Sequence, residues 1–184
     1  VDDDHIFSSI KKSDKTIEFM SNTIDDFRNF YKPDKKKELF HISIACEKAI
    51  SLVNAALKNT NIELKVEIIE DKKILGHPRE YSQVILNLIS NAKDVLLERE
   101  IKNPKINIVI NSRDEKSLVC IKDNAHGIKE ENIDMIFDPY FSTKSFSNGT
   151  GLGLYISKLI IEENMNGRLS ARNGKNGAIF EIEV

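Results

Sequence analysis

The sequence predicts an α+β fold, with helices on one face of a mostly antiparallel sheet. Stretches with strand and helix periodicity mix along the chain without regular βαβ alternation, which argues against a parallel sheet wound on both faces. The chain has 184 residues, of which 40% are hydrophobic, so it can bury a single core. We therefore expect one domain, or one domain with an appendage.

The first element is a helix expected over residues 6–31. Its apolar positions repeat as a heptad seam, the pattern of a coiled coil: Ile10, Ile17, Met20, Ile24, Phe27 and Tyr31. Pro33 ends this helix, and PDKKK reads as a short solvated linker. One helix cannot bury its own stripe, so we favour half of a helical hairpin or dimer stalk over a helix packed on its own domain.

The remaining elements follow from hydrophobic periodicity and turn residues. In the first half we expect a short strand at LFHI, a helix over 43–59, a half-buried strand over 62–69 and a helix over 81–98. In the second half we expect an antiparallel pair (105–110 and 117–123, joined through SRDEK), a short helix over 132–137, an irregular segment over 138–150, a helix over 150–164, and two closing strands (167–173 and 178–184) joined by a Gly-Lys-Asn-Gly turn.

Two helices should carry most of the core on one face each. The helix over 43–59 should bury Ile44, Ala45, Ala49, Leu52, Val53, Ala56 and Leu57. The helix over 81–98 should bury Val84, Ile85, Leu88, Ile89, Ala92, Val95 and Leu96.

Charge and cysteine content exclude several classes of function. Charged residues make up 30% of the chain and nearly cancel, leaving a net charge of −2, so no basic field favours nucleic acid. Cys46 and Cys120 lie in apolar contexts and are expected to be reduced core thiols. With neither a signal peptide nor a membrane-length apolar run, we expect a cytoplasmic location. The chain starts without Met, which suggests a piece of a longer protein, whose membrane anchoring stays open.

A glycine-rich stretch, Gly149, Gly151 and Gly153, precedes the last expected helix. It matches neither a Walker loop nor the GxGxxG dinucleotide fingerprint, because loop rather than strand precedes it and no third glycine follows at the required place. A glycine-rich entry to a helix suits an anion such as phosphate, although a flexible turn explains the same residues.

Three further stretches could contact a nucleotide. Asp123, in DNAHGI at the end of a strand, could accept a hydrogen bond from an exocyclic amine such as adenine's, or could simply form an Asx turn. Asn87, Asn91, Asp94 and Glu98 share one helix face, where an Asn oxygen suits Mg²⁺ but a solvated face is the simpler alternative.

The last stretch is IFDPYFSTK, in which Phe137, Tyr140 and Phe141 flank a proline and Lys144 follows. Aromatic residues in a polar loop indicate a segment that packs when closed, and its lysine could then reach a phosphate. Alternatively, Phe141 only pins the loop to the core.

The order of these four stretches resembles the ATP-binding domain of sensor histidine kinases, in the wider group that includes gyrase, the Hsp90 chaperones and MutL. NLISNAKD is similar to the N box, DNAHGI to the first glycine box, IFDPYFSTK to the F box and GTGLGLYISK to the second glycine box. TIDDFRNFYKPDKKKELF resembles the second helix of a dimerisation domain. The resemblance implies a partial dimerisation domain over 1–33 and an ATP-binding catalytic domain over 34–184, built as a two-layer α/β sandwich with a mixed sheet (the Bergerat fold).

The resemblance also implies roles for single residues. Asn91 should ligate Mg²⁺, Asn87 should face the phosphates, Asp123 should bind the adenine amine, and residues 138–150 should form a lid over ATP. The ATP-binding set is Asn87, Asn91, Asp94, Asp123, Gly127, Ile128, Phe137, Lys144, Thr150, Gly151, Leu152, Gly153 and Leu154. Ala125, where many relatives have glycine, and Asp94, where many have lysine, depart from the pattern.

The residue type at position 87 favours a kinase over an ATP hydrolase. The hydrolysing relatives usually have Glu at this place as a general base, and an amide cannot accept a proton at neutral pH. None of His5, His41, His77 and His126 matches the family's phosphoacceptor motif. We therefore expect a histidine kinase fragment in a two-component phosphorelay that does not phosphorylate itself. Its expected partners are ATP or ADP, a separate phosphoacceptor helix, a response regulator and a second copy, with no nucleic acid. An ATP-binding interaction module and a gyrase-like ATPase remain alternatives.

Overall fold

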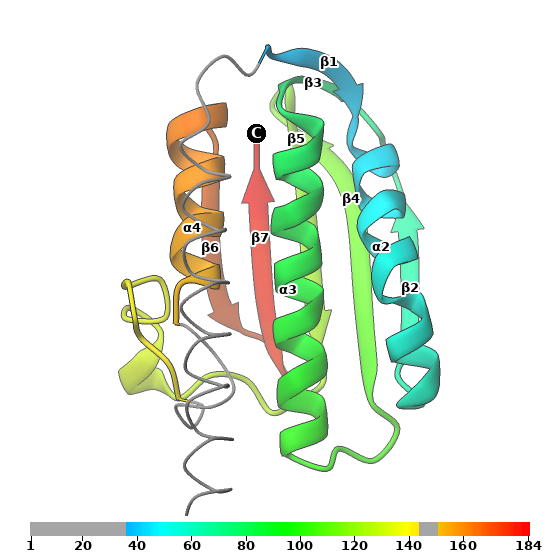
Figure 1. Ribbon diagram of the computed structural model, residues 1–184, viewed down its shortest axis with the longest axis vertical. Helices are drawn as coiled ribbons and strands as arrows, with labels where there is room; N and C mark the ends of the chain where they lie inside the picture. The colour runs from blue at the N-terminus through cyan, green and yellow to red at the C-terminus, as the bar shows by residue number, and fades with distance from the viewer. Residues whose placement is uncertain (1–35, 144–150) are drawn as a thin grey trace, which may run out of the picture.

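The computed structural model describes residues 36–143 and 151–184 (Figure 1). The expected helix over 6–31, and Lys144 and Thr150 among the site residues, lie outside the described residues. The described part forms two layers, with α2, α3 and α4 side by side on one face of a sheet (Figure 1). The predicted α+β architecture is therefore confirmed.

The main sheet has five strands in the order β2-β4-β5-β7-β6. Their bounds are β2 Glu63–Ile68, β4 Lys105–Arg113, β5 Lys116–Asp123, β6 Arg168–Asn173 and β7 Ala178–Glu183. Only β2 and β4 pair in parallel, and the other three pairs are antiparallel, so the sheet is mixed but mostly antiparallel, as predicted. The β4–β5 turn is tighter than expected, since Asp114 and Glu115 alone connect the strands, both with positive φ (51° and 66°).

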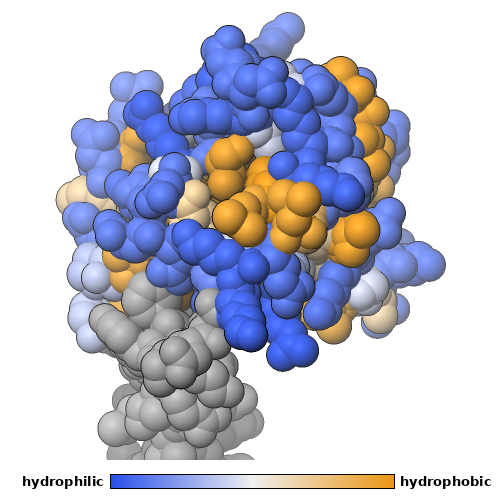
Figure 2. Space-filling model, turned by 90° about the horizontal axis from the view of Figure 1, so that it is seen from above, coloured by the Kyte–Doolittle hydropathy of each residue, from blue (hydrophilic) through white to orange (hydrophobic). Residues whose placement is uncertain are grey.

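A second sheet of two strands was not predicted in full. β1 (Glu38–His41) matches the expected short strand, and it pairs antiparallel with β3 (Lys73–Gly76), a strand that was not predicted. Phe40 and Ile74 are partners that face the core, while Leu39 and Leu75 are partners that face solvent, 64% and 60% exposed. Figure 2 looks onto this end of the molecule and shows apolar side chains gathered on the surface.

Helix α3 (Pro78–Glu98) is the centre of the core. Pro78 starts it at a position where the missing N–H costs nothing, and His77 is its N-cap residue. Its predicted inward face is buried except for Val95, which is half-buried. Opposite it, Ile106, Ile108, Ile110, Val119, Ile121 and Ile182 of the sheet are at most 1% exposed. Each such side chain contributes about 1.5–3 kcal/mol on burial.

Helix α2 (Ile42–Asn59) has the predicted bounds within one residue, but its buried face was predicted wrongly in part. Ile44 and Leu52 are 60% and 67% exposed, and Ala56 is also exposed. Cys46, which was not assigned to this face, is buried. The core therefore takes a narrower stripe, Ile42, Ala45, Cys46, Ala49, Val53 and Leu57, than the run of apolar residues suggested.

Three other expectations need correction. The strand over 62–69 is not half-buried: β2 lies at the edge of the sheet, and Val66, Ile68 and Ile69 are 45–60% exposed. The helix over 132–137 is wrong, because a 3₁₀ turn, η1 (Glu130–Asn132), is followed only by turns. The helix over 150–164 begins later, as α4 (Gly153–Leu159), and continues as a π-helix, η2 (Ile160–Asn164).

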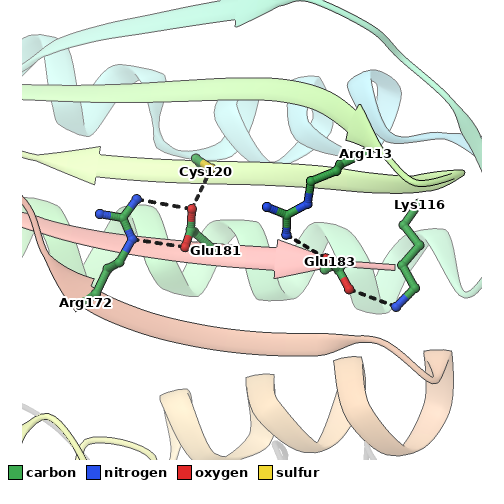
Figure 3. Close-up of polar contacts among 6 residues, drawn as sticks. All are labelled: Arg113, Lys116, Cys120, Arg172, Glu181 and Glu183. Carbon is green, nitrogen blue, oxygen red and sulfur yellow. Dashed lines mark hydrogen bonds and ion pairs between the residues drawn. The ribbon is translucent and has the colours of Figure 1, made fainter.

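The face of the sheet away from the helices carries paired charges (Figure 3). Glu181 accepts from the Arg172 guanidinium at 3.2 Å and from the Cys120 thiol at 3.4 Å. Glu183 pairs with Arg113 and Lys116. Cys46 and Cys120 are both free thiols, but Cys120 lies on this outer face and not in the core.

No helix within residues 36–143 and 151–184 is long and apolar enough to cross a membrane.

Candidate functional site

Helix α3 meets the start of α4 through Asn87. The Asn87 Nδ2 donates to the buried Ser157 Oγ at 2.9 Å. Gly153 lies so close that a Cβ atom added there would stand 2.6 Å from Asn87 Oδ1. The glycine thus permits the approach of the two helices, and the N box and the second glycine box lie together in space.

Asn91 lies one turn further along α3 and is half-buried. Its side chain makes no hydrogen bond within the described part of the chain, so its amide oxygen can serve as a ligand. Asp94, three residues on, forms an ion pair with the adjacent Lys93 at 3.0 Å. On the helix face predicted from spacing, Asn87 is hydrogen-bonded, Asp94 is ion-paired, and Asn91 has no partner among residues 36–143 and 151–184.

The described residues contain no group of three or more His, Cys, Asp or Glu side chains that could hold a metal ion. Mg²⁺ is commonly bound through one or two protein oxygens, with nucleotide phosphates and waters completing its shell. The Asn91 side-chain oxygen fits such a site, in which the protein supplies one ligand. The described residues do not form a site built from several carboxylates.

Asp123 is the last residue of β5, and the two oxygens of its carboxylate have different surroundings. Oδ1 accepts from the Ala125 N–H at 2.8 Å and from the Ala178 N–H at 3.2 Å. Oδ2 receives no hydrogen bond from any described residue. The Asx-type turn is thus present, and it orients the carboxyl group while leaving one oxygen for a ligand.

Burial raises the pKa of Asp123, against the two backbone N–H groups and the positive charge of Arg99, which lower it. Three contacts therefore favour the ionised form of this carboxyl group: the N–H groups of Ala125 and Ala178, and the charge of Arg99. Such a perturbed acid beside a glycine turn is typical of a ligand-binding position.

The turn after Asp123 is held in place by contacts with Asn173. His126 and Gly127 both have positive φ, 66° and 81°. A Cβ atom at Gly127 would stand 2.5 Å from Asn173 Oδ1, so a side chain has no room there. Asn173 also pairs with the backbone of Ile128 in both directions, each hydrogen bond 2.7 Å long. Asn173 therefore fixes the backbone of Ile128 next to this turn.

The aromatic segment IFDPYFSTK is attached to the core through Phe137 and Phe141. This agrees with the simpler alternative given above, in which Phe141 pins the loop to the core. Phe137 makes an edge-to-face contact with Phe180 at 6.5 Å, and the Lys158 Nζ lies 5.1 Å from the Phe137 ring centre. Phe141 is half-buried against the core, whereas Tyr140 is 67% exposed. These contacts fix the base of the expected lid.

The second glycine box is packed against that base. Gly151 has φ 67°, and a Cβ atom there would stand 2.5 Å from the carbonyl carbon of Tyr140. Leu152 is fully buried, Gly153 begins α4, and Leu154 packs against the core. The backbone of 151–154 therefore lies between the aromatic segment and α3.

Four residues that hold this arrangement were missed from the sequence: Arg99, Ser157, Lys158 and Asn173. Each contacts a residue at least 21 positions away, and Arg99 and Asn173 belong to none of the four boxes. Only Ser157 and Lys158, which lie within the quoted GTGLGLYISK, could have been singled out by position.

Comparison with known proteins gives a consistent picture. The family model described as "Histidine kinase-, DNA gyrase B-, and HSP90-like ATPase" matches residues 76–184. The "Two-component sensor PprA" of Pseudomonas aeruginosa is 28% identical over all of this chain. The catalytic domain of histidine kinase ThkA superposes with a TM-score of 0.72 at 28% identity, covering 82% of this chain and 95% of that structure.

Two of these comparisons concern larger proteins. The chain spans about a fifth of the length of PprA, 20%. A structure of ThkA in complex with the response regulator protein TrrA shares the fold, with a TM-score of 0.72 at 23% identity over 99% of this chain and 50% of that one.

Proposed function

Because the chain belongs to the family of histidine kinase-, DNA gyrase B- and HSP90-like ATPases, we propose that it is the ATP-binding catalytic portion of a sensor histidine kinase that transfers the γ-phosphoryl group of Mg-ATP to a histidine. The acceptor is a histidine other than the four in this chain, on a dimerisation helix. A response regulator then receives the phosphoryl group on an aspartate.

The observation that carries the nucleotide assignment is the divided carboxylate of Asp123. Its Oδ1 is fixed by two backbone N–H groups, and its Oδ2 is left to accept one hydrogen bond. An exocyclic amine of adenine donates such a bond, and Gly127 and Ile128 form the adjoining wall. Phe137 and the start of α4 then close the phosphate end of the site.

In the proposed site, the phosphates bind between residues 151–154 and helix α3. In this proposal the N–H groups of 151–154 meet the phosphates, Leu152 anchors that backbone in the core, and Asn91 offers its oxygen to Mg²⁺. Asp94 borders the same region from α3. When bound, Mg²⁺ neutralises phosphate charge and orients the reacting group. Lys144 and Thr150 remain predicted phosphate contacts, outside the described residues.

Asn87 supports transfer over hydrolysis. Its amide donates to Ser157 Oγ, and an amide cannot deprotonate a water molecule at neutral pH. Water near the γ-phosphate is therefore not activated from this position. The chain's own contribution is to place and neutralise the nucleotide, and the nucleophile comes from the acceptor helix.

Domain organisation and partners belong to the same proposal. Residues 1–33 would be the second helix of a dimerisation domain and 34–184 the catalytic domain, with a second copy paired through the helical part. The crystallised complex of ThkA with TrrA supports a response regulator as a partner for this chain as well.

Transfer is tested by adding ATP with a labelled γ-phosphate to the chain, with and without a helical hairpin that carries a histidine followed by an acidic residue. We expect label on the hairpin histidine, lost with Asn91→Ala, and little free phosphate. Tight nucleotide binding with no transfer would favour an interaction module. Steady phosphate release without the hairpin would favour a gyrase-like ATPase.

A further inference from the structure

Arg99 is held firmly at the end of α3, the helix that carries Asn87 and Asn91. The Glu100 N–H donates to the Leu97 carbonyl, and the Ile101 N–H donates to the Leu96 carbonyl. With Glu100 in the left-handed conformation (φ 49°), these two bonds form a Schellman motif. These bonds, with that from the Arg99 N–H to the Val95 carbonyl, fix the Arg99 backbone to the end of α3.

The Arg99 side chain crosses to the turn that follows Asp123. Its Nη1 donates both to the Ala125 carbonyl and to the Gly127 carbonyl, the latter at 2.8 Å. The two carbonyls converge because the intervening backbone is left-handed at His126 and Gly127. A charged donor strengthens such bonds, so Arg99 ties the turn to the end of α3.

Arg99 also acts on Asp123 by its charge. Lys122 precedes Asp123 and His126 lies three residues after it, yet Arg99, at the C-terminal end of α3, is the charged side chain that lowers the Asp123 pKa against the effect of burial. One side chain thus fixes the turn and favours the ionised carboxylate.

We propose that Arg99 is a positioning residue that sets nucleobase specificity: it holds the turn of residues 125–127 on α3 and keeps Asp123 a hydrogen-bond acceptor, so that a base with an exocyclic amine is preferred to one with a carbonyl at that position. The inference rests on the proposed function, because it takes Asp123 as the residue that meets the base.

The chemistry of Asp123 gives a readout that a purely structural role would not change. An ionised carboxylate only accepts, and it therefore suits the amine of adenine. A protonated carboxyl donates, and it therefore suits the carbonyl of hypoxanthine. The ratio of ADP affinity to IDP affinity reports which form of Asp123 is present.

The test is calorimetric titration of ADP and of IDP between about pH 4 and about pH 8, a range that begins near the ordinary pKa of an aspartate and extends in the direction of the shift. The proteins are the parent, Arg99→Met, Arg99→Lys and the control Arg113→Met, whose arginine pairs with Glu183 on the outer face of the sheet. Thermal unfolding of each variant checks the fold.

For Arg99→Met we expect ADP binding about tenfold weaker at neutral pH, as for loss of a charged hydrogen bond. Its ADP binding should fail at a higher pH than the parent's, because Asp123 then takes up a proton more readily, and its preference for ADP over IDP should narrow. Arg99→Lys keeps the charge but not the planar guanidinium, so it should weaken ADP binding with less change in pH dependence. Arg113→Met should match the parent.

Equal weakening of ADP and IDP at every pH would overturn the specificity role. Parent-like affinity and preference in Arg99→Met would also overturn it, while the proposed function would stand. If Arg99→Met does not fold, the test rests on Arg99→Lys. Parent-like ADP affinity in Arg99→Lys would then refute the positioning role of Arg99. Absence of ADP binding by the parent would instead refute the proposed function, and with it this inference.

Discussion

Gly153→Ala tests the contact between α3 and α4 without any nucleotide. The added Cβ would stand 2.6 Å from Asn87 Oδ1, closer than real side chains approach, so Asn87 must move. When it moves, its hydrogen bond to Ser157, 2.9 Å long, is lost or distorted. The substitution should therefore destabilise the fold through Asn87.

The magnitude follows from opposing contributions. Replacing glycine with alanine where the backbone permits it stabilises by about 0.4–1 kcal/mol, through the unfolded chain. Losing the hydrogen bond costs about 0.5–1.5 kcal/mol, and forcing a group into a packed contact costs about 1–3 kcal/mol. We expect Gly153→Ala to lower the free energy of unfolding by about 1–2 kcal/mol.

Urea unfolding of the parent, Gly153→Ala, Asn87→Ala and the double variant measures this coupling. With Asn87 truncated, the obstacle is gone, so Gly153→Ala should then stabilise by about 0.4–1 kcal/mol. Gly151→Ala is the matched control: its φ of 67° and the Tyr140 backbone make alanine unfavourable in both backgrounds. If Gly153→Ala has the same sign and size with and without Asn87, the reasoning is refuted.

Glu100 is a poor residue for its left-handed position, φ 49°, so Glu100→Gly should raise the free energy of unfolding in urea by about 0.5–1 kcal/mol, and more than Asn61→Gly does at the equivalent place after α2 (φ 54°). Equal effects at the two sites would contradict this. The Arg172 guanidinium holds the pKa of Glu181 below its usual value, so ionised Glu181 stabilises the fold at neutral pH and this contribution disappears as pH falls through the folded-state pKa. Glu181→Gln should accordingly make unfolding less sensitive to acid, and an unchanged acid transition would count against the pair. Asn91→Ala should remove the tightening that Mg²⁺ gives to ATP binding in calorimetry, whereas a persisting metal effect would place the ligand elsewhere.

Much of the fold could be predicted because its elements are locally periodic. The face of α3, the β4–β5 pair and the closing β6–β7 pair each show a clear period along the sequence. β3 was missed because it has four residues and forms only with β1, 32 or more positions earlier. Ile44 and Leu52 were placed inside because periodicity cannot tell how wide a stripe the neighbouring elements cover.

The sequence predicted candidate site residues but not the contacts that they make. The order of the four boxes singled out Asn87, Asp123 and Gly153 as candidates, yet the partner of Asn87 lies 70 positions away in sequence. Arg99 follows the N box without belonging to it, and its contacts depend on how α3 ends beside β5. Such partners follow from tertiary packing, which no local pattern encodes.

The proposed function rests on the binding of adenine by Asp123. The most direct measurement is a calorimetric titration of ADP into the parent and into Asp123→Asn, which keeps an oxygen for the N–H groups of Ala125 and Ala178 but no longer offers a carboxylate. We expect the parent to bind and Asp123→Asn to bind about tenfold more weakly or worse, as for loss of a charged acceptor. Equal affinity in the two proteins, or no ADP binding by the parent with or without Mg²⁺, would contradict the account.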